Sequence, residues 1–176
     1  MSTSDTQRKR PPESVWDYPR PPALVSTTSR IRILLQVDGS SDNELVIADT
    51  QNALRVLETS HPPTYYIPAK DVNTSALKCN PKTSFCEWKG IAEYYDLKHP
   101  TSSSTLEAVA WTYRNPNAKY EKLANYIAFY AMKPLRCFVD DEQVVAQEGN
   151  FYGGWKTSEI SGGERGIKGG PGTLGW

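Results

Sequence analysis

The side chains best suited to proton transfer lie in residues 58–68, which read Glu-Thr-Ser-His-Pro-Pro-Thr-Tyr-Tyr-Ile-Pro. Glu58 and His61 are three positions apart, so the carboxylate can orient an imidazole that exchanges protons near neutral pH. The hydroxyl of Tyr65 or Tyr66 can donate a hydrogen bond to an oxygen that becomes negative during a reaction. We therefore predict an acid/base site here. The alternative is a stiff turn that leads into a β-strand.

Glu58 is predicted to end a short strand. Side chains alternate along a strand, so Glu58 shares a face with Leu54 and Val56. If that face is buried, the loss of solvent raises the pKa of the carboxyl group toward the range of a useful acid or base. The alternative is an ion pair at the strand end with a cation such as Lys89.

His61 precedes Pro62, which disfavours a helical backbone and holds His61 in an extended or turn conformation. A stiff backbone aims the imidazole ring, although the ring can also simply cap an exposed turn. Tyr65 and Tyr66 must point to opposite faces of the next strand, so at most one of them can face a pocket. We predict that one of the two stabilises negative charge on a substrate.

A second motif covers residues 85–90, Phe-Cys-Glu-Trp-Lys-Gly. In a strand, alternation would group Cys86 with Trp88 and place Glu87 and Lys89 on the other face. Lys89 is predicted to supply positive potential to the site; the alternatives are an ion pair with Glu87 and Schiff-base chemistry. Predicted substrate contacts come from Cys86, Glu87, Trp88, Trp111 and Trp155. Core packing is the alternative for Trp111.

The elements that must position these residues are short and mostly of β type, with polar turns between them. Strands are predicted at 31–37, 44–49, 53–58, 64–67, 84–89, 91–97 and 105–113, with a closing hairpin over 135–146. A short helix is predicted at 71–77 and a longer one at 117–130, whose second half can instead be a strand. This pattern predicts one compact α+β domain, mostly β, with antiparallel strands in a barrel-like or folded-over arrangement.

The chain divides into three parts. Residues 1–29 are rich in proline and are expected to form an extended arm. Residues 30–148 form the β-rich core. Residues 149–176 contain ten of the twelve glycines and are expected to pack on or over the core as a lid that carries Trp155.

Composition narrows the class of protein. The 20 basic and 20 acidic side chains cancel, so a nucleic-acid partner is not expected. No apolar run is long enough for a membrane helix or a signal peptide, which indicates a soluble, cytoplasmic protein with no membrane partner. The three cysteines include no C-x-x-C pair, so we expect free thiols and no structural zinc. A monomer or homodimer that binds a small organic molecule is predicted.

Five segments in order resemble a known family. They are Val-Ile-Ala-Asp-Thr, the segment 58–68, Phe-Cys-Glu-Trp-Lys-Gly, Ala-Val-Ala-Trp-Thr-Tyr, and Tyr-Ile-Ala-Phe-Tyr before Cys-Phe-Val-Asp. Together they resemble the family called domain of unknown function 427, also labelled nucleotidyltransferase-like, over roughly residues 30–146. The resemblance implies a relationship to β-tent folds, in which two small antiparallel sheets lean together. Other β-tent proteins hold zinc through paired C-x-x-C motifs, which this chain lacks, so the metal is not carried over.

Three functions remain open on these observations. The leading prediction is an enzyme of the isomerase, cyclase, lyase or hydrolase type that uses acid/base chemistry, without metal or cofactor, in a pocket lined by Tyr and Trp. The first alternative is a noncatalytic module that holds a small ligand in an aromatic cage. The second is nucleotidyl transfer, as the family label implies, which requires carboxylates that hold Mg²⁺. The adjacent pair Asp140-Asp141 is the candidate, although it lies in a predicted hairpin turn.

Overall fold

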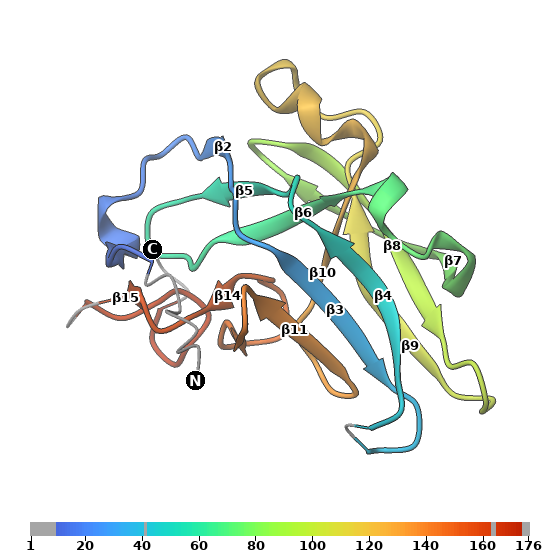
Figure 1. The fold of residues 1–176 in the computed structure, drawn as a ribbon. Coiled ribbons are helices and arrows are strands. Elements are labelled where there is room, and N and C mark those ends of the chain that lie inside the picture. Colours follow the sequence, from blue (N-terminus) through green and yellow to red (C-terminus); the bar gives the residue numbers. More distant parts are fainter. Residues whose placement is uncertain (1–9, 41, 163–164, 174–176) are drawn as a thin grey trace, which may run out of the picture.

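The computed structural model describes residues 10–40, 42–162 and 165–173. Two antiparallel sheets dominate it (Figure 1). The seven-stranded sheet has the order β2 (Ala23–Ser26), β5 (Leu54–Leu57), β6 (Thr64–Pro68), β10 (Tyr126–Phe129), β9 (Thr105–Thr112), β8 (Gly90–Lys98) and β7 (Leu77–Cys86). The four-stranded sheet has the order β12 (Glu142–Gln143), β11 (Leu135–Val139), β3 (Ile31–Gln36) and β4 (Glu44–Thr50). The predicted class, an α+β domain that is mostly β with antiparallel sheets, is confirmed.

Smaller elements join these sheets to the two ends of the chain. β1 (Glu13–Ser14) pairs with β15 (Ile160–Ser161), and β13 (Val145–Ala146) pairs with β14 (Trp155–Lys156). The helical segments are 3₁₀ turns: η1 (Val15–Asp17), η2 (Ala69–Asp71), η3 (Thr74–Ala76) and η4 (Ala118–Asn125). None of these turns, which are the helices of the described chain, has the length or apolar character needed to cross a bilayer.

The main core lies between the two sheets. Strand β3 buries every second residue, Ile31, Ile33 and Leu35, which is the pattern of a strand with one face on a core. These side chains belong to the same buried cluster as Tyr65 and Ile67 of β6. The opposite face of β6 carries Tyr66, so strand alternation separates the two tyrosines as predicted.

A second buried cluster covers the outer face of the seven-stranded sheet and is rich in aromatic rings. It contains Val56, Tyr66, Ala92, Tyr94, Trp111, Tyr113, Tyr120, Leu123 and Ala128. Tyr120 and Leu123 come from η4, whose turn places both of them against the sheet. Tyr120 also donates a hydrogen bond to the carbonyl of Pro22 (2.8 Å), which ties the N-terminal arm to this face.

Most predicted strands are present near their expected bounds, but the segment 84–89 differs. β7 ends at Cys86, residues 87–89 form a turn, and Gly90 begins β8 opposite Cys86. Gly90 has φ +102°, a conformation that favours glycine, so it closes a hairpin rather than forming a bulge. Asn117 fixes the turn through hydrogen bonds to the carbonyls of Trp88 (2.8 Å) and Lys89 (3.0 Å).

The predicted helices are replaced by shorter structures. Within 71–77 the only helical structure is the end of η2 and the turn η3, and Leu77 already begins β7. β7 continues through Pro81 with a register shift between Asn80 and Thr83, as an edge strand permits. The segment 117–130 begins as η4 and then becomes β10, the strand alternative for its second half. β10 pairs with both β6 and β9, and these sheet bonds outweigh the helical spacing of its apolar residues.

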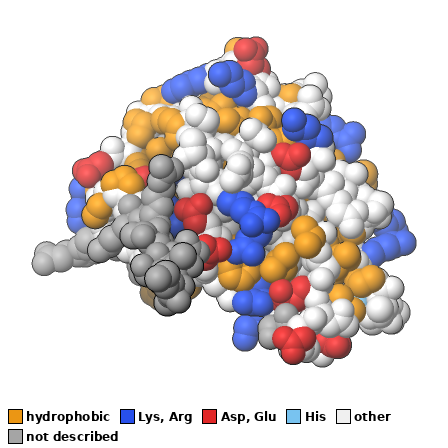
Figure 2. All heavy atoms as spheres, in the orientation of Figure 1, with side chains coloured by type: hydrophobic (Ala, Val, Ile, Leu, Met, Phe, Trp, Pro, Cys, Tyr) orange, Lys and Arg blue, Asp and Glu red, His pale blue; other side chains and the backbone are white. Residues whose placement is uncertain are grey.

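The closing hairpin is shorter than predicted, because Val145 and Ala146 pair with the tail strand β14 instead. The arm and the tail lie against each other: β1 pairs with β15, and the indole of Trp16 donates to the carbonyl of Gly166 (3.0 Å). On the face shown in Figure 2, acidic and basic side chains are intermingled, with no large area of one sign.

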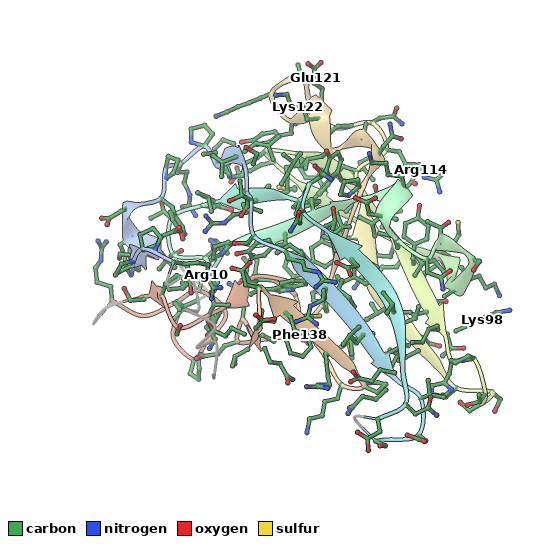
Figure 3. All side chains as sticks on the ribbon, viewed as in Figure 1. Arg10, Lys98, Arg114, Glu121, Lys122 and Phe138 are labelled. Atoms are coloured by element: carbon green, nitrogen blue, oxygen red, sulfur yellow. The ribbon has the colours of Figure 1, made fainter. Side chains whose placement is uncertain are left out.

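Arg10 joins the arm, the tail and the four-stranded sheet. Its guanidinium donates to Asp140 (2.9 Å), to Glu159 (2.6 Å) and to Glu142. Figure 3 places Arg10 beside the C-terminal segment, whereas Lys98 and Arg114 lie at the periphery. Burial works to raise the pKa values of Asp140 and Glu159, but the hydrogen bonds from Arg10 outweigh it and both pKa values are lowered.

Arg10→Met should lower the free energy of unfolding at pH 7 by about 1–3 kcal/mol, because three carboxylates lose their shared cation. A carboxyl group with a lowered folded pKa stabilises the protein above its ordinary value and loses that effect as the pH falls. The ordinary values are 3.8 for Asp140 and 4.5 for Glu159, so the deficit should shrink between pH 5 and pH 3. Urea unfolding at pH 5 and at pH 3 measures this change in the deficit, with Lys98→Met as the control. A deficit that does not change with pH would contradict this account of the cluster.

Candidate active site

A cavity of about 420 Å³ opens on the outer face of the seven-stranded sheet. Its floor is formed by β5 and β6 and by the aromatic side chains of β8 and β9. One side is the hairpin turn between β7 and β8. The other side is formed by the tail residues Gln147, Phe151, Tyr152, Gly153 and Lys168. The polar lining residues are Arg20, Glu58, His61, Thr64, Tyr66, Ser84, Cys86, Glu87, Lys89, Tyr94, Tyr113, Tyr130, Gln147, Tyr152 and Lys168.

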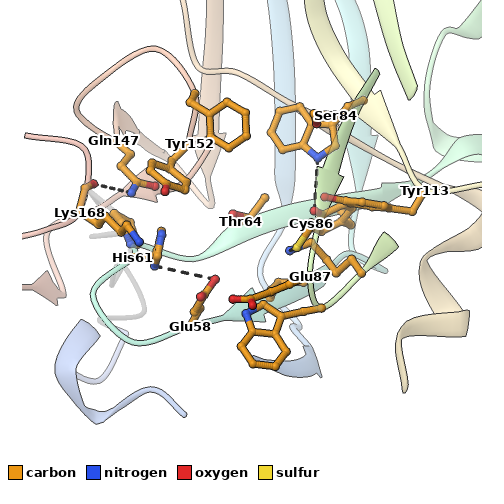
Figure 4. A pocket seen from close by; sticks show the side chains of 18 of the residues that line it. Glu58, His61, Thr64, Ser84, Cys86, Glu87, Tyr113, Gln147, Tyr152 and Lys168 are labelled. Atoms are coloured by element: carbon orange, nitrogen blue, oxygen red, sulfur yellow. Dashed lines mark hydrogen bonds and ion pairs between the residues drawn. The ribbon is translucent and has the colours of Figure 1, made fainter. Parts of the chain in front are cut away.

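One side of the cavity holds a Glu58–His61 pair (Figure 4). The Nδ1 atom of His61 lies 2.9 Å from the carbonyl oxygen of Thr59. A carbonyl can only accept, so Nδ1 carries the proton and Nε2 of the neutral ring has a free lone pair. Nε2 makes no hydrogen bond to any described residue. Glu58 Oε2 is 3.9 Å from Nδ1, and Arg20 donates to Glu58 Oε1 (3.1 Å).

His61 is neutral at neutral pH. Its side chain is largely buried, and this burial lowers the pKa below the ordinary 6.5. The carboxylate of Glu58 and the carbonyl of Thr59 favour the charged ring, while Lys168 and Arg20 oppose it. The ring also meets Tyr152 edge-on, with centroids 4.8 Å apart, so its orientation is held from both sides.

The other side of the cavity holds Lys89, which is 8% exposed although it lies in a turn. Its ammonium donates to Cys86 Sγ (3.3 Å) and lies 5.5 Å from the ring centre of Tyr113. No carboxylate of the described residues lies within ion-pair distance of Lys89. Burial works to lower the pKa of Lys89, but interactions with Tyr66 and Cys86 outweigh it and the pKa is raised. Lys89 is therefore a buried cation at neutral pH, which disfavours its use as a nucleophilic amine.

Two tyrosine hydroxyls accompany Lys89. Tyr66 is 1% exposed and accepts a hydrogen bond from the indole of Trp111 (3.3 Å). Burial raises the pKa of Tyr66, although Lys89 and the hydrogen bonds from Trp111 and Tyr113 act against it. Burial also raises the pKa of Tyr113. Both phenols keep their protons at neutral pH. The hydroxyl of Tyr113 is engaged with Tyr66 and Cys86, so the proton of Tyr66 is the one left to donate to an oxygen in the cavity.

Aromatic rings form the rest of the cavity wall. Trp111 and Tyr130 have ring centres 4.6 Å apart, and the hydroxyl of Tyr130 donates to the carbonyl of Phe151 in the tail (2.7 Å). The tail approaches Trp111 closely at Gly153, where a Cβ atom would lie 2.1 Å from the indole. Only glycine permits this approach, so the tail covers the aromatic wall at this residue.

The structure brings together most of the residues that the sequence singled out. Glu58, His61, Tyr66, Cys86, Glu87, Trp88, Lys89 and Trp111 all line the cavity. Tyr65 does not line it, because alternation along β6 places this ring in the core between the sheets. Trp155 does not line it either: it is 1% exposed, stacks on Tyr65 with ring centres 5.2 Å apart, and donates to the carbonyl of Phe129 (3.0 Å).

Several residues that line the cavity were not predicted from the sequence. Tyr113 is two residues after Trp111, and strand alternation alone would have placed both on one face. Gln147, Tyr152 and Lys168 come from the tail, which has no periodic pattern to predict where it packs. Gln147 donates to the carbonyl of Lys168 (2.7 Å) and accepts from the amide of Gly154 (3.1 Å), which holds this part of the tail at the cavity.

A comparison with known families places the domain that builds this cavity. A family model described as Domain of unknown function (DUF427), with the label NTP_transf_9, matches residues 23–144. The chain belongs to this family. The match starts at the first residue of β2, earlier than the sequence motifs indicated, because β2 is an integral edge strand that pairs with β5. The comparison with curated proteins found no match.

The cavity of this DUF427 domain does not fit the metals considered above. The three cysteines are dispersed, with Cys79 exposed, Cys86 at the cavity and Cys137 in the core. Within the described residues no three His, Cys, Asp or Glu side chains come together as a metal site. Asp140 and Asp141 do not line the cavity, and Asp140 is bound to Arg10.

Proposed function

We propose that this DUF427 domain is an enzyme that transfers a proton to and from a small organic molecule in the cavity. The observation that supports this most strongly is the placement of a proton acceptor and an anion-stabilising group in one cavity. His61 and Glu58 lie on one side, and Cys86 and Tyr113, next to Lys89, lie on the other, with Thr64 between them (Figure 4).

In the proposed reaction, Nε2 of His61 accepts a proton from a carbon or oxygen atom of the substrate. Nδ1–H stays bonded to the Thr59 carbonyl, and the Glu58 carboxylate 3.9 Å away stabilises the imidazolium that forms. The electrons that remain on the substrate move toward an oxygen near Lys89, where Tyr66 donates a hydrogen bond. Return of the proton to another atom gives an isomerisation, and loss of a leaving group gives an elimination.

A suitable test is the Kemp elimination of 5-nitrobenzisoxazole, which needs no knowledge of the natural substrate. A base removes the proton on the ring carbon, the electrons of that bond complete a nitrile, the N–O bond breaks, and the oxygen becomes a phenolate. The reaction of this flat aromatic probe needs a base, and a group that stabilises the developing phenolate accelerates it further. The protein should accelerate the reaction beyond the same concentration of free imidazole and acetate. A rate equal to that of the free bases would count against the proposal.

The pH dependence of that rate should identify the base. His61 accepts a proton only when neutral, so the rate should fall as His61 becomes protonated at low pH. Because burial lowers the pKa of His61 below 6.5, the half-maximal rate is expected below pH 6.5. Stopped-flow pH jumps, in which the protein is kept at pH 7 until mixing, separate this effect from unfolding. A half-maximal rate above pH 6.5 would contradict the assignment of His61.

A further inference from the structure

Lys89 carries a positive charge on a buried side chain that lines the cavity. A buried ammonium is costly unless a negative charge compensates it. Lys89 is 8% exposed and lines the cavity, yet its hydrogen bond goes to the thiol of Cys86. The nearest carboxylates that line the cavity are otherwise engaged or exposed: Glu58 is paired with Arg20, and Glu87 is exposed. Glu58 attracts Lys89 only from beyond ion-pair distance, so within the described residues this positive charge has no direct carboxylate partner.

The groups around Lys89 are hydrogen-bond donors that point to an anion. The buried phenols of Tyr66 and Tyr113 keep their protons, and the indole of Trp111 already donates to the oxygen of Tyr66. With that lone pair used, the hydroxyl proton of Tyr66 is free to be directed toward another acceptor. A buried cation beside an available phenol proton matches an acidic oxygen better than a neutral or a positive group.

The walls indicate the shape of the rest of the ligand. Trp111, Tyr94 and Tyr130 form adjacent aromatic surfaces, with ring centres of Trp111 and Tyr94 6.5 Å apart. On the tail side, Tyr152 and Phe151 are in contact with each other at 5.2 Å. Such surfaces bury flat apolar rings well, and a positively charged ligand would be repelled by Lys89.

We infer that the substrate is a flat, unsaturated organic acid whose ionised oxygen binds to Lys89 and Tyr66, with its ring system against Trp111 and Tyr130. The inference rests on the proposed function in that the bound acid is the molecule from which His61 takes a proton. It goes beyond that function because it specifies a charge and a shape that proton transfer alone does not require. It also excludes the cationic ligands that aromatic cages hold.

The competing interpretation is that Cys86 is itself ionised and neutralises Lys89. In that case the cation is already compensated, and an added anion gains little from it. Replacement of the thiol by a hydroxyl in Cys86→Ser removes this negative charge while keeping a hydrogen-bond partner. Anion binding would then appear only in the Cys86→Ser variant and not in the natural protein.

The test compares 4-fluorobenzoate with 4-fluorobenzamide, which have the same ring and differ in charge. Their dissociation constants are measured at pH 7.5 by ¹⁹F NMR titration of the full chain. The benzoate should bind about 10- to 100-fold more tightly, since hydrogen bonds to a charged group contribute about 1.5–3 kcal/mol. Lys89→Met should abolish this preference. Lys168→Met, which removes the other lysine of the cavity, should keep it.

Each outcome separates the two claims. Equal binding of the two probes, a preference that survives Lys89→Met, or a preference that is lost in Lys168→Met would overturn the inference. If Lys89→Met does not fold, the variant Tyr66→Phe replaces it and should reduce the preference about tenfold. A Kemp elimination rate with no benzoate preference leaves proton transfer standing and removes the acid. A Lys89-dependent preference without any Kemp elimination does the reverse.

Discussion

His61→Ala should lower the rate of the Kemp elimination by about 10²- to 10⁴-fold, the usual contribution of a positioned base. The reason is specific to this ring: Thr59 holds the proton on Nδ1, so the lone pair of Nε2 is the part of the ring left to act as base. The rate is measured at saturating 5-nitrobenzisoxazole, so that a weaker affinity for the probe does not imitate a slower proton transfer.

Two controls make this result specific. His99→Ala removes the only other histidine of the chain, which does not line the cavity, and should leave the rate unchanged. Glu58→Gln keeps the shape of the pair but removes the charge 3.9 Å from Nδ1, so a smaller loss than that of His61→Ala is expected. If His61→Ala retains the full rate while its circular dichroism spectrum is unchanged, His61 is not the base.

Trp155→Ala should lower the free energy of unfolding by about 3–5 kcal/mol, the range found when a large buried ring is removed. The indole stacks on Tyr65 and donates to the carbonyl of Phe129, so the variant leaves both a cavity and an unpaired acceptor. Trp155 also closes the tail onto β6, because its backbone amide donates to the carbonyl of Pro63 (2.8 Å). Urea unfolding at pH 7 measures the change.

The matched control is Val145→Ala, on the partner strand of the same small sheet. Val145 is 61% exposed, so its loss should change stability by less than about 0.5 kcal/mol. A small effect of Trp155→Ala would mean that the tail contributes little to the core. In that event the lining residues of the tail, Gln147, Tyr152 and Lys168, would have to be held at the cavity by other contacts.

Local sequence patterns predicted one half of the site and missed the other half. β5 ends at Leu57, one residue before the predicted end, so Glu58 and His61 both lie in the turn between β5 and β6, and Tyr66 lies on β6. A proline restricts the backbone at His61, and strand parity decides the direction of Tyr66. These are local effects, so they can be read from the order of residues. The family motifs also indicated a fold of antiparallel sheets, and the structure contains such sheets.

Lys89 shows the limit of that reasoning. Lys89 lies in a hairpin turn, where the alternation of side chains along a strand does not hold. Its position depends on hydrogen bonds from Asn117, which is far along the chain. Strand β10 also depends on distant residues. Its apolar residues have helical spacing, but the segment forms a strand because it pairs with β6 and β9. Both depend on contacts between residues that are distant in sequence, and no local pattern encodes such contacts.

The order of amino acids was therefore sufficient for the class of fold, for the division of Tyr65 and Tyr66 between core and cavity, and for the proline-stiffened corner at His61. These follow from backbone geometry within a few residues. Only the folded chain shows that Lys89 is buried without an ion-pair partner among the described residues and that the tail covers Trp111. Only the folded chain shows that His61 and Lys89 line the same cavity. Burial and convergence are properties of packing between distant segments, and the candidate chemistry of this protein arises from them.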